Sequence, residues 1–278
     1  MADARAIAFA VREAIGAAAT TLRPDVLAAM RAALVAESSA RGRSVLEQLI
    51  RNAEVAEADR VPLCQDTGTV WVRVELGAEE RLGEPLQPVI DEAVREAYRT
   101  HALRMSVVRD ALLDRTNTDD NTPAFIELVT RPGTGATVHV MLKGGGSDNS
   151  SALTMLDPSA GIEGVKEFVL RTVEANATGA CPPLVVGVGI GTTFDKVAGL
   201  AKRALLLPLG SDSEGAAGAL ERELLDLVNA TGIGPAGLGG RTTALGVKVL
   251  TAPCHIAALP VAVNMGCSAV RTATVEVV

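Results

Sequence analysis

Aromatic side chains and clustered positive charges are both scarce in this sequence. Phe, Trp and Tyr make up 2% of the 278 residues, with a single tryptophan, Trp71, and a single tyrosine, Tyr98. Base-stacking platforms and aromatic cages need several such rings, so neither is expected here. The 26 Lys and Arg residues are outnumbered by 33 Asp and Glu residues, which gives a net charge of −7, and they form no basic block. This charge balance argues against a nucleic-acid partner.

Long apolar runs and close cysteine pairs are also missing. No uninterrupted apolar run reaches the roughly 18 residues of a membrane-spanning helix. Residues 2–20 carry Arg and Glu inside an apolar stretch, which predicts an amphipathic helix and not a signal peptide. No two of Cys64, Cys181, Cys254 and Cys267 have a CxxC spacing, and disulfides are not expected without a secretion signal. We therefore expect a cytoplasmic protein whose thiols are reduced.

The sequence does have apolar periodicity, which predicts a mixed α and β fold of the α+β class. Hydrophobic residues make up 48% of the chain, enough for a sizeable core. We expect a single domain over residues 1–278, in which a mostly helical part at 1–60 precedes mixed β-sheets with packed helices at 61–278. Helices are predicted at residues 2–18, 24–37, 43–57, 85–104, 194–206 and 213–230, and strands at 70–76, 124–130, 136–143, 184–190, 246–252 and 260–266.

Three details of this pattern carry further expectations. Residues 70–76, VWVRVEL, alternate in polarity, which predicts a strand with one polar face. The strands at 124–130 and 136–143 flank Arg-Pro-Gly-Thr-Gly, which predicts a β-hairpin. The glycine-rich segment 232–246 is the best candidate for a mobile loop.

Residues 143–151, KGGGSDNSS, follow a predicted strand and combine three glycines with a lysine. Glycines let backbone N–H groups approach an anion closely, and Lys143 adds positive charge. The Gly-Lys-Ser/Thr order of a Walker A loop is absent. The motif by itself leaves two interpretations open, an anion-binding loop and a flexible surface turn.

Residues 181–193, CPPLVVGVGIGTT, contain a G-x-G-x-G series formed by Gly187, Gly189 and Gly191. A dinucleotide-binding fingerprint needs a different glycine spacing and an acidic residue after the following strand, and neither is present. We expect a strand whose glycines admit close approach of a ligand or cofactor, entered by Cys181 at a rigid Pro-Pro corner. A nucleotide-binding oxidoreductase that uses residues 187–191 stays open as an alternative function.

Polar groups surround two of the cysteines. Cys64 lies in CQDTGT beside an amide, a carboxylate and hydroxyls, whereas a structural cysteine usually packs among aliphatic residues. A reactive or metal-binding thiolate needs such polar or cationic neighbours. His255, one of three histidines in the chain, lies twelve residues before Cys267, and Arg271 lies four residues after it. Residues 115–124, RTNTDDNTPA, predict an Asx-rich turn.

Taken together, these motifs resemble one family. CQDTGT, NTxxNTPA, KGGGS, CPP followed by VGVGIG, and LPVxVxxxCSAxR occur in this order in the α part of the iron-sulfur hydro-lyases, which include class I fumarase and L-tartrate dehydratase. The resemblance runs from about residue 43 to the C-terminus. Several of these enzymes join an α part and a β part in one chain. This sequence matches the α part, so the resemblance implies a separate α subunit that works with a β subunit in a hetero-oligomer.

The resemblance implies that Cys64, Cys181 and Cys267 hold a 4Fe-4S cluster, and it leaves Cys254 without a role. Three thiolates leave one iron of the cube without a protein ligand. That iron can bind a substrate oxygen and act as a Lewis acid on a hydroxyl group.

The resemblance also implies a set of substrate contacts. They are Gln65, Asp66, Arg104, Gly145 or Gly146, and His255. Asp66 and His255 would take part in catalysis, Asp66 by orienting or activating a proton-transferring group and His255 by hydrogen-bonding substrate oxygens. Arg104 would clamp one carboxylate, but the segment after it differs in length from that of long fumarases, so Arg109 and Arg115 are rival candidates. Further cationic contacts belong to the β part in this family, so the site should be incomplete without a β subunit.

The expected function is therefore that of a hydro-lyase α subunit acting on a C4 dicarboxylate, with reversible hydration of fumarate to malate favoured. L-tartrate dehydratase is the alternative within the family. A non-catalytic subunit with inert cysteines is a third hypothesis, and it predicts no iron after anaerobic purification.

Overall fold

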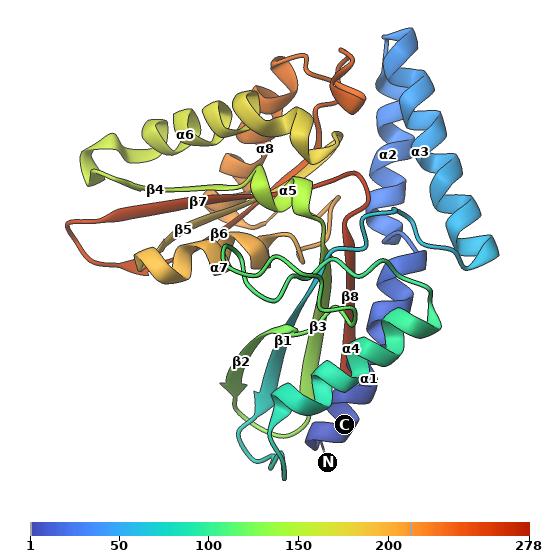
Figure 1. The fold of residues 1–278 in the computed structure, drawn as a ribbon. Coiled ribbons are helices and arrows are strands. Elements are labelled where there is room, and N and C mark those ends of the chain that lie inside the picture. The colour runs from blue at the N-terminus through green and yellow to red at the C-terminus, as the bar shows by residue number, and fades with distance from the viewer. Residues whose placement is uncertain (1, 212) are drawn as a thin grey trace. The chain divides into compact units, whose positions relative to one another are not determined.

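The computed structural model describes residues 2–211 and 213–278, which divide into two compact units (Figure 1). Unit 1 comprises Met1–Arg23, Ala53–Gly145 and Arg271–Val278, and unit 2 comprises Pro24–Asn52 and Gly146–Val270. Each unit is assembled from separate segments, so the chain crosses between the units several times. Two of the crossings, Gly145 to Gly146 and Val270 to Arg271, fall inside motifs singled out in the sequence. The expectation of a single domain stays a prediction.

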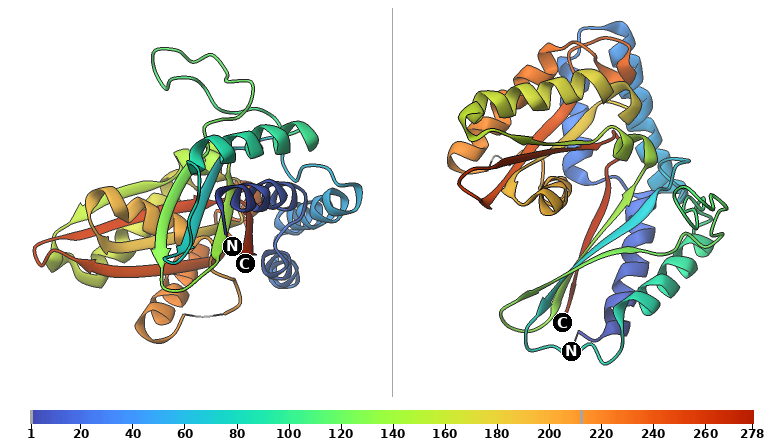
Figure 2. Two further views of the ribbon diagram at one scale, coloured as in Figure 1. Left: turned by 90° about the horizontal axis from the view of Figure 1, so that it is seen from below. Right: turned by 60° about the vertical axis from the view of Figure 1, so that its left-hand side comes forward.

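Unit 1 is a four-stranded sheet with helices α1 and α4 on one face (Figures 1 and 2). The strand order is β2-β1-β3-β8. The elements are α1 (Ala4–Thr20), β1 (Thr69–Gly77), α4 (Leu86–Thr100), β2 (Phe125–Arg131), β3 (Ala136–Lys143) and β8 (Arg271–Val277). Asp3 caps α1 by accepting a hydrogen bond from Ala6 N at 2.8 Å. Ile7, Val11 and Ile15 recur at helical spacing on the buried stripe of α1 and pack in one apolar cluster with the sheet.

The opposite face of this sheet is polar, as the alternation in residues 70–76 predicts. Arg73 on β1 is only 8% exposed and forms ion pairs with Glu75 at 2.9 Å and with Glu127 on β2 at 2.6 Å. On β3, His139 Nδ1 is hydrogen-bonded to Thr274 Oγ1 of β8 at 2.9 Å, and burial lowers the pKa of this imidazole. Because His139 Nε2 also lies 3.9 Å from Glu75, these groups link all four strands.

The hairpin predicted for residues 124–143 is wrong, because β1 lies between β2 and β3. β1 pairs in parallel with β2 and antiparallel with β3. The turn of residues 132–135 passes the end of β1, where Gly77 N donates to Gly135 O at 2.7 Å. Residues 132–135 do form the turn that their sequence predicts. However, β1, a strand from earlier in the chain, lies between β2 and β3.

Unit 2 is a second four-stranded sheet, with helices on both faces. The strand order is β4-β7-β5-β6. The elements are α2 (Pro24–Ala36), β4 (Ala152–Leu156), α6 (Gly161–Asn176), β5 (Leu184–Thr192), α7 (Phe194–Ala204), α8 (Gly215–Ala230), β6 (Ala244–Cys254) and β7 (Leu259–Gly266). α6 and α8 cover one face, and on the other face Val197 and Ala201 of α7 meet Ala262 of β7. Helices α3 (Ala40–Asp59) and α5 (Gly145–Asn149) have residues in both units.

The glycines of β5 admit a helix, and not the ligand or cofactor expected from the sequence. A Cβ at Gly187 would lie 2.3 Å from Ala201 O. A Cβ at Gly189 would lie 2.6 Å from Ala201 N and 2.7 Å from Val197 O. The two glycines therefore let the backbone of α7 pack directly on the sheet. This packing accounts for the sequence feature on which the nucleotide-binding alternative rests.

The glycine-rich segment 232–246 is anchored by hydrogen bonds, which corrects the expectation of a mobile loop. Glu37, at the end of α2, is 3% exposed, and its Oε2 accepts Arg241 N at 2.8 Å and Thr242 N at 3.3 Å. Burial alone would raise the pKa of Glu37, but these backbone donors and Ser39 N outweigh it and hold that pKa below its ordinary value. A buried carboxylate from elsewhere in unit 2 therefore fixes the start of β6.

The predicted helices and strands are otherwise present as α1–α4, α7, α8, β1–β3 and β5–β7. The sequence pattern does not predict α5, α6, β4 or β8. None of the helices in the described ranges 2–211 and 213–278 is long and apolar enough to cross a membrane.

We predict that Gly189→Ala lowers the free energy of unfolding by about 1–3 kcal/mol, because the added methyl group overpacks the contact between β5 and α7. Chemical denaturation of the full chain measures this change. Gly199→Ala is the matched control, since Gly199 lies on α7 and a Cβ there would meet no other element within 4 Å. That change should raise stability by about 0.5–1 kcal/mol through helix propensity. A Gly189→Ala chain as stable as the wild type would contradict the packing interpretation.

Candidate functional site

The first candidate site is a loop of unit 1, residues 64–68, named here the Cys64 loop. It is fixed at both ends. Before it, Leu63 N donates to Ala19 O of α1 at 2.9 Å. At its end, Gly68 has a φ of +76°, and a Cβ there would lie 2.4 Å from Lys143 O at the end of β3. Glycine is therefore required where the loop passes the glycine-rich motif.

Cys64 and Gln65 form the accessible part of this loop. Cys64 is half-buried, Gln65 is exposed, and Cys64 Sγ lies 3.6 Å from Gln65 Oε1. Behind them, the buried Tyr98 hydroxyl donates to Gly68 O at 2.9 Å. Burial raises the pKa of Tyr98, so this hydroxyl stays a neutral donor. The loop thus presents a thiol and an amide outward from a fixed backbone.

Asp66 connects the Cys64 loop to three other segments of unit 1. Its Oδ1 accepts Gly68 N at 3.2 Å and lies 3.3 Å from Arg104 Nη2. Its Oδ2 accepts Gly145 N at 2.9 Å. Its backbone oxygen accepts a hydrogen bond from Arg271 Nη1. The glycine-rich motif therefore binds a carboxylate of its own chain, that of Asp66, through the N–H of Gly145.

The structure brings Arg104, and not Arg109 or Arg115, to the Cys64 loop. The backbone oxygen of Arg104 accepts a hydrogen bond from Thr67 Oγ1 at 2.6 Å. The Arg104 side chain is 57% exposed and has one long contact with Asp66, so its remaining donors can serve a ligand. Arg109 and Arg115 are exposed on the following loop, where Arg115 Nη1 donates to Ala111 O at 2.7 Å.

The NTDDNTPA motif does more than form the predicted turn. Asn121 is fully buried, its Oδ1 accepts Ser106 N at 2.7 Å, and its Nδ2 donates to Gly68 O at 3.2 Å. Asn117 Nδ2 donates to Met105 O at 3.0 Å. The motif therefore holds the segment that carries Arg104 against the Cys64 loop. Sequence reasoning missed this role, although the repeated Asn-Thr pairs were the signal for it.

Asp120, in the same motif, ties this segment to α4. Its carboxylate accepts Thr122 N at 3.0 Å and pairs with Arg95 Nε at 2.9 Å. Burial alone would raise the pKa of Asp120, but these donors lower it to about 2. Asp120 is consequently ionised over the whole working range of a neutral-pH enzyme.

Arg271 is a second residue whose role sequence reasoning missed. It is the first residue of β8, is 3% exposed, and donates through Nη1 to the backbone oxygen of Asp66. Its Nε has no hydrogen-bond partner among residues 2–211 and 213–278. Its place in the CSAxR motif, four residues after a cysteine, was the available signal.

A second candidate site lies in unit 2, where the segments of Cys181 and Cys267 come together. Cys181 precedes β5 and Cys267 follows β7, and these antiparallel strands pair with Val185 opposite Gly266. Ser268 N donates to Cys181 O at 3.2 Å. Cys181 is exposed and has a φ of +56°, a conformation that non-glycine residues rarely adopt and that often marks functional positions.

Gly146 belongs to this second site, in unit 2. A Cβ on Gly146 would lie 2.6 Å from Gly179 O, so the glycine allows the start of α5 to approach the turn before Cys181. Ser150 Oγ donates to Gly146 O at 2.9 Å and fixes this approach. The glycine-rich motif is therefore an ordered junction and not a flexible turn.

His255 lies at the opposite end of the same sheet. It follows Cys254, which pairs with Thr192 at the far end of β5 from Cys181. β5 has nine residues, which span roughly 25–30 Å. Within one chain the structure does not bring His255 to Cys267, because a whole strand separates them. His255 and Cys254 instead form an exposed turn in which Ala257 N donates to His255 Nδ1 at 3.1 Å.

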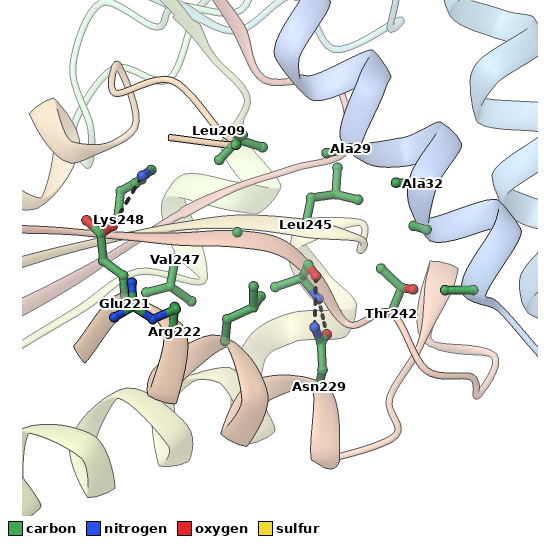
Figure 3. A pocket seen from close by; sticks show the side chains of 16 residues that line it. Ala29, Ala32, Leu209, Glu221, Arg222, Asn229, Thr242, Leu245, Val247 and Lys248 are labelled. Carbon is green, nitrogen blue, oxygen red and sulfur yellow. Dashed lines mark hydrogen bonds and ion pairs between the residues drawn. The ribbon is translucent and has the colours of Figure 1, made fainter. Parts of the chain in front are cut away.

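Unit 2 also contains a pocket of about 440 Å³ between α2, α8 and β6 (Figure 3). Its lining is mainly apolar, with Ala29 and Ala32 on α2 and Leu245 on β6. Of the two cationic residues that line it, Arg222 and Lys248, Lys248 is paired with Glu221 at 3.2 Å. None of the site residues named from the sequence lines this pocket.

The four cysteines lie within the described ranges, and none of them forms a disulfide. Within neither unit do the described residues gather three His, Cys, Asp or Glu side chains at metal-binding distance. In unit 2, Cys181 and Cys267 lie at neighbouring positions of the sheet; in unit 1, Cys64 lies on a loop whose Asp66 backbone oxygen accepts a hydrogen bond from the buried Arg271. Thiolates with N–H donors nearby are the chemistry that an iron-sulfur cluster needs, so these residues fit the group.

Comparison with known proteins agrees with the motifs. The family model for fumarate hydratase (Fumerase) matches residues 8–276. A chain of Methanocaldococcus jannaschii with the provisional name L(+)-tartrate dehydratase subunit alpha is 42% identical over 96% of each chain. L(+)-tartrate dehydratase subunit alpha of Escherichia coli strain K12 is 35% identical over 93% of this chain and 86% of its own length. The chain therefore belongs to the fumarate hydratase (Fumerase) family of hydro-lyases.

Proposed function

We propose that this chain is the α subunit of a 4Fe-4S hydro-lyase that dehydrates L(+)-tartrate and works with a separate β subunit. The observation that carries the proposal is the set of contacts made by Asp66. That carboxylate holds an arginine suited to a substrate carboxylate beside the loop that carries Cys64. The cytoplasmic location expected from the sequence remains a prediction.

We propose Cys64, Cys181 and Cys267 as the cluster ligands. The two thiols of unit 2 are neighbours at one end of its sheet, and the thiol of unit 1 is on a fixed, accessible loop. Cys254 is excluded because it is at the far end of β5 from Cys181. The cluster, when bound, supplies a Lewis-acidic iron that makes a substrate hydroxyl a better leaving group.

Covalent geometry supports the convergence of these cysteines, whatever the arrangement of the two units. Asp66 binds the N–H of Gly145, and Gly145 is bonded directly to Gly146. Gly146 in turn packs against Gly179, two residues before Cys181. Each residue of chain spans at most about 3.6 Å, so this route keeps Cys181 on a short tether from the Cys64 loop.

A second route leads to the third cysteine. Arg271 donates to the backbone oxygen of Asp66, and Cys267 precedes Arg271 by four residues. Four residues span at most about 14 Å. Both routes start from Asp66, so one residue of the Cys64 loop anchors the chain near the other two ligands.

The residues around Asp66 have distinct tasks in this proposal. Arg104 binds one substrate carboxylate through a charge-assisted pair, exchanging its long contact with Asp66 for the ligand. Gln65, exposed beside Cys64, hydrogen-bonds a substrate oxygen. Asp66 keeps Arg104 and Gly145 in place and thereby orients the group that moves the proton.

Two of the expected substrate contacts change in the light of the geometry. The N–H of Gly145 is taken by Asp66, so of the two glycines we propose Gly146 for contact with substrate. His255 is too far along the sheet to serve the cysteine pair of its own chain, and we leave it out of the site formed by one chain. The substrate has two carboxylates, and Arg104 binds only one of them. We therefore assign the remaining cationic contacts to the β subunit.

The choice of substrate rests on the relatives. Two chains that are 35–42% identical over most of their length are named for L(+)-tartrate, which favours tartrate over the fumarate expected from the sequence. The family model is named for fumarate hydratase, so hydration of fumarate to malate is the second candidate. The two substrates differ by one hydroxyl, and a site distinguishes them by where it places hydrogen-bonding partners.

We predict that Cys64→Ser, Cys181→Ser and Cys267→Ser each abolish iron uptake in anaerobic reconstitution. The wild-type chain should take up about four irons and absorb broadly near ~400 nm, as thiolate-bound clusters do. Cys254→Ser is the matched control and should keep both properties. If Cys254→Ser loses the cluster and Cys267→Ser keeps it, the third ligand is wrongly assigned.

We predict that the α chain alone shows little turnover and that the anaerobically assembled complex with its β-type chain converts L(+)-tartrate to oxaloacetate. Assays with both tartrates, fumarate and both malates measure the preference. Turnover of fumarate and malate without tartrate would replace the proposed substrate by the second candidate. Full activity of the α chain alone would contradict the divided site.

We predict that Arg104→Lys lowers kcat/KM of the complex by about 10- to 100-fold, because a lysine cannot form the bidentate pair with a carboxylate. Arg115→Lys is the control and should leave kcat/KM unchanged, since Arg115 points to the exposed loop. If the Arg115 variant loses activity and the Arg104 variant keeps it, the clamp lies on the later loop.

A further inference from the structure

Arg271 is a buried guanidinium that the described part of the chain satisfies only in part. It begins β8 opposite Leu142 of β3 and is 3% exposed. Nη1 donates to the backbone oxygen of Asp66. Nε has no acceptor within residues 2–211 and 213–278. A buried N–H without an acceptor is costly to leave, so such an atom indicates a ligand that completes it.

Arg73, another buried arginine of unit 1, has its charge balanced by carboxylates of the chain itself. Arg73 is 8% exposed, and its Nε and Nη1 form ion pairs with Glu75 and Glu127. Arg271 donates to a neutral carbonyl oxygen instead. A buried cation needs compensating negative charge, and a bound anionic group would add to the charge of the nearby Asp66 carboxylate.

The surroundings place the Arg271 guanidinium beside the Cys64 loop. The position of a Cβ on Gly144 lies 3.4 Å from Arg271 Nη2 and 3.1 Å from Asp66 Oδ2. Arg271 therefore lies against the backbone that follows Cys64.

We propose that Arg271 donates its Nε–H to a sulfur of the iron-sulfur cluster and is a positioning residue that connects the cluster to Asp66. This inference rests on the proposed function. Cluster sulfurs accept N–H hydrogen bonds, and a cube held by three thiolates carries the net negative charge that a buried guanidinium requires. Arg271 is also four residues from one proposed ligand and bonded to the loop of another.

The proposal predicts an effect on the cluster itself. A positive charge and a hydrogen bond at sulfur stabilise the more negative, reduced cluster, so Arg271 raises the reduction potential. The competing acceptor is a substrate carboxylate. In that case Arg271 would affect substrate binding and leave the potential of the substrate-free cluster unchanged.

The test uses the full-length chain reconstituted anaerobically with its β-type partner, in the absence of substrate. We expect Arg271→Gln to assemble the cluster with a reduction potential shifted to more negative values in an electron-paramagnetic-resonance titration. Arg271→Lys keeps the charge and should show a smaller shift. Arg73→Gln is the matched control, a buried arginine of the same unit, and should lose stability without any shift.

An unshifted potential in an Arg271→Gln protein with a full complement of iron would overturn the proposal. A shift that appears only after substrate is added would assign Nε to the substrate. If Arg271→Gln takes up no iron, the melting temperature of the apo chain decides: an unchanged value supports a role through the cluster, and a large loss overturns it. If the wild-type complex itself contains no iron, the proposed function is rejected. That outcome differs from the others, which concern only the Arg271→Gln variant of an iron-containing complex.

Discussion

The carboxylate of Asp66 is the interaction on which the rest of the site depends. It is a half-buried anion that accepts two backbone N–H groups and meets an arginine, while its own backbone oxygen is held by a second arginine. These contacts join four segments that are distant in sequence. A charged acceptor can order several donors at once, since each charge-assisted bond is stronger than a neutral one. The backbone of the Cys64 loop is therefore held by contacts within the chain.

Much of the architecture could be predicted from the sequence because it follows from local rules. Apolar periodicity located most helices and strands, and five ordered motifs identified the family, which the family model and the curated relatives confirm. The polar face of β1 followed from simple alternation, and Arg73 fills it with ion pairs. Asp66 and Arg104, which the resemblance names as substrate contacts, form an ion pair at 3.3 Å.

The failures share one cause, which is that partners distant in the sequence decided the outcome. β1 separates β2 from β3 although the turn between them has hairpin chemistry. The glycines of β5 face a helix that begins after them, and Glu37 anchors a segment some two hundred residues later. His255 and Cys267 are close in sequence, but an intervening strand carries them to opposite ends of a sheet. No local pattern contains that information.

The origin of β8 has a consequence for how the protein forms. Unit 1 takes its outer strand from the last residues of the chain, after all of unit 2 has been made. During synthesis, one edge of β3 stays unpaired until β8 is made, more than a hundred residues later. Arg271 arrives with that strand, so the contact between it and Asp66 closes last. β7, an interior strand of the unit 2 sheet, ends only four residues before β8, so both sheets depend on late strands, and such long-range pairing slows folding.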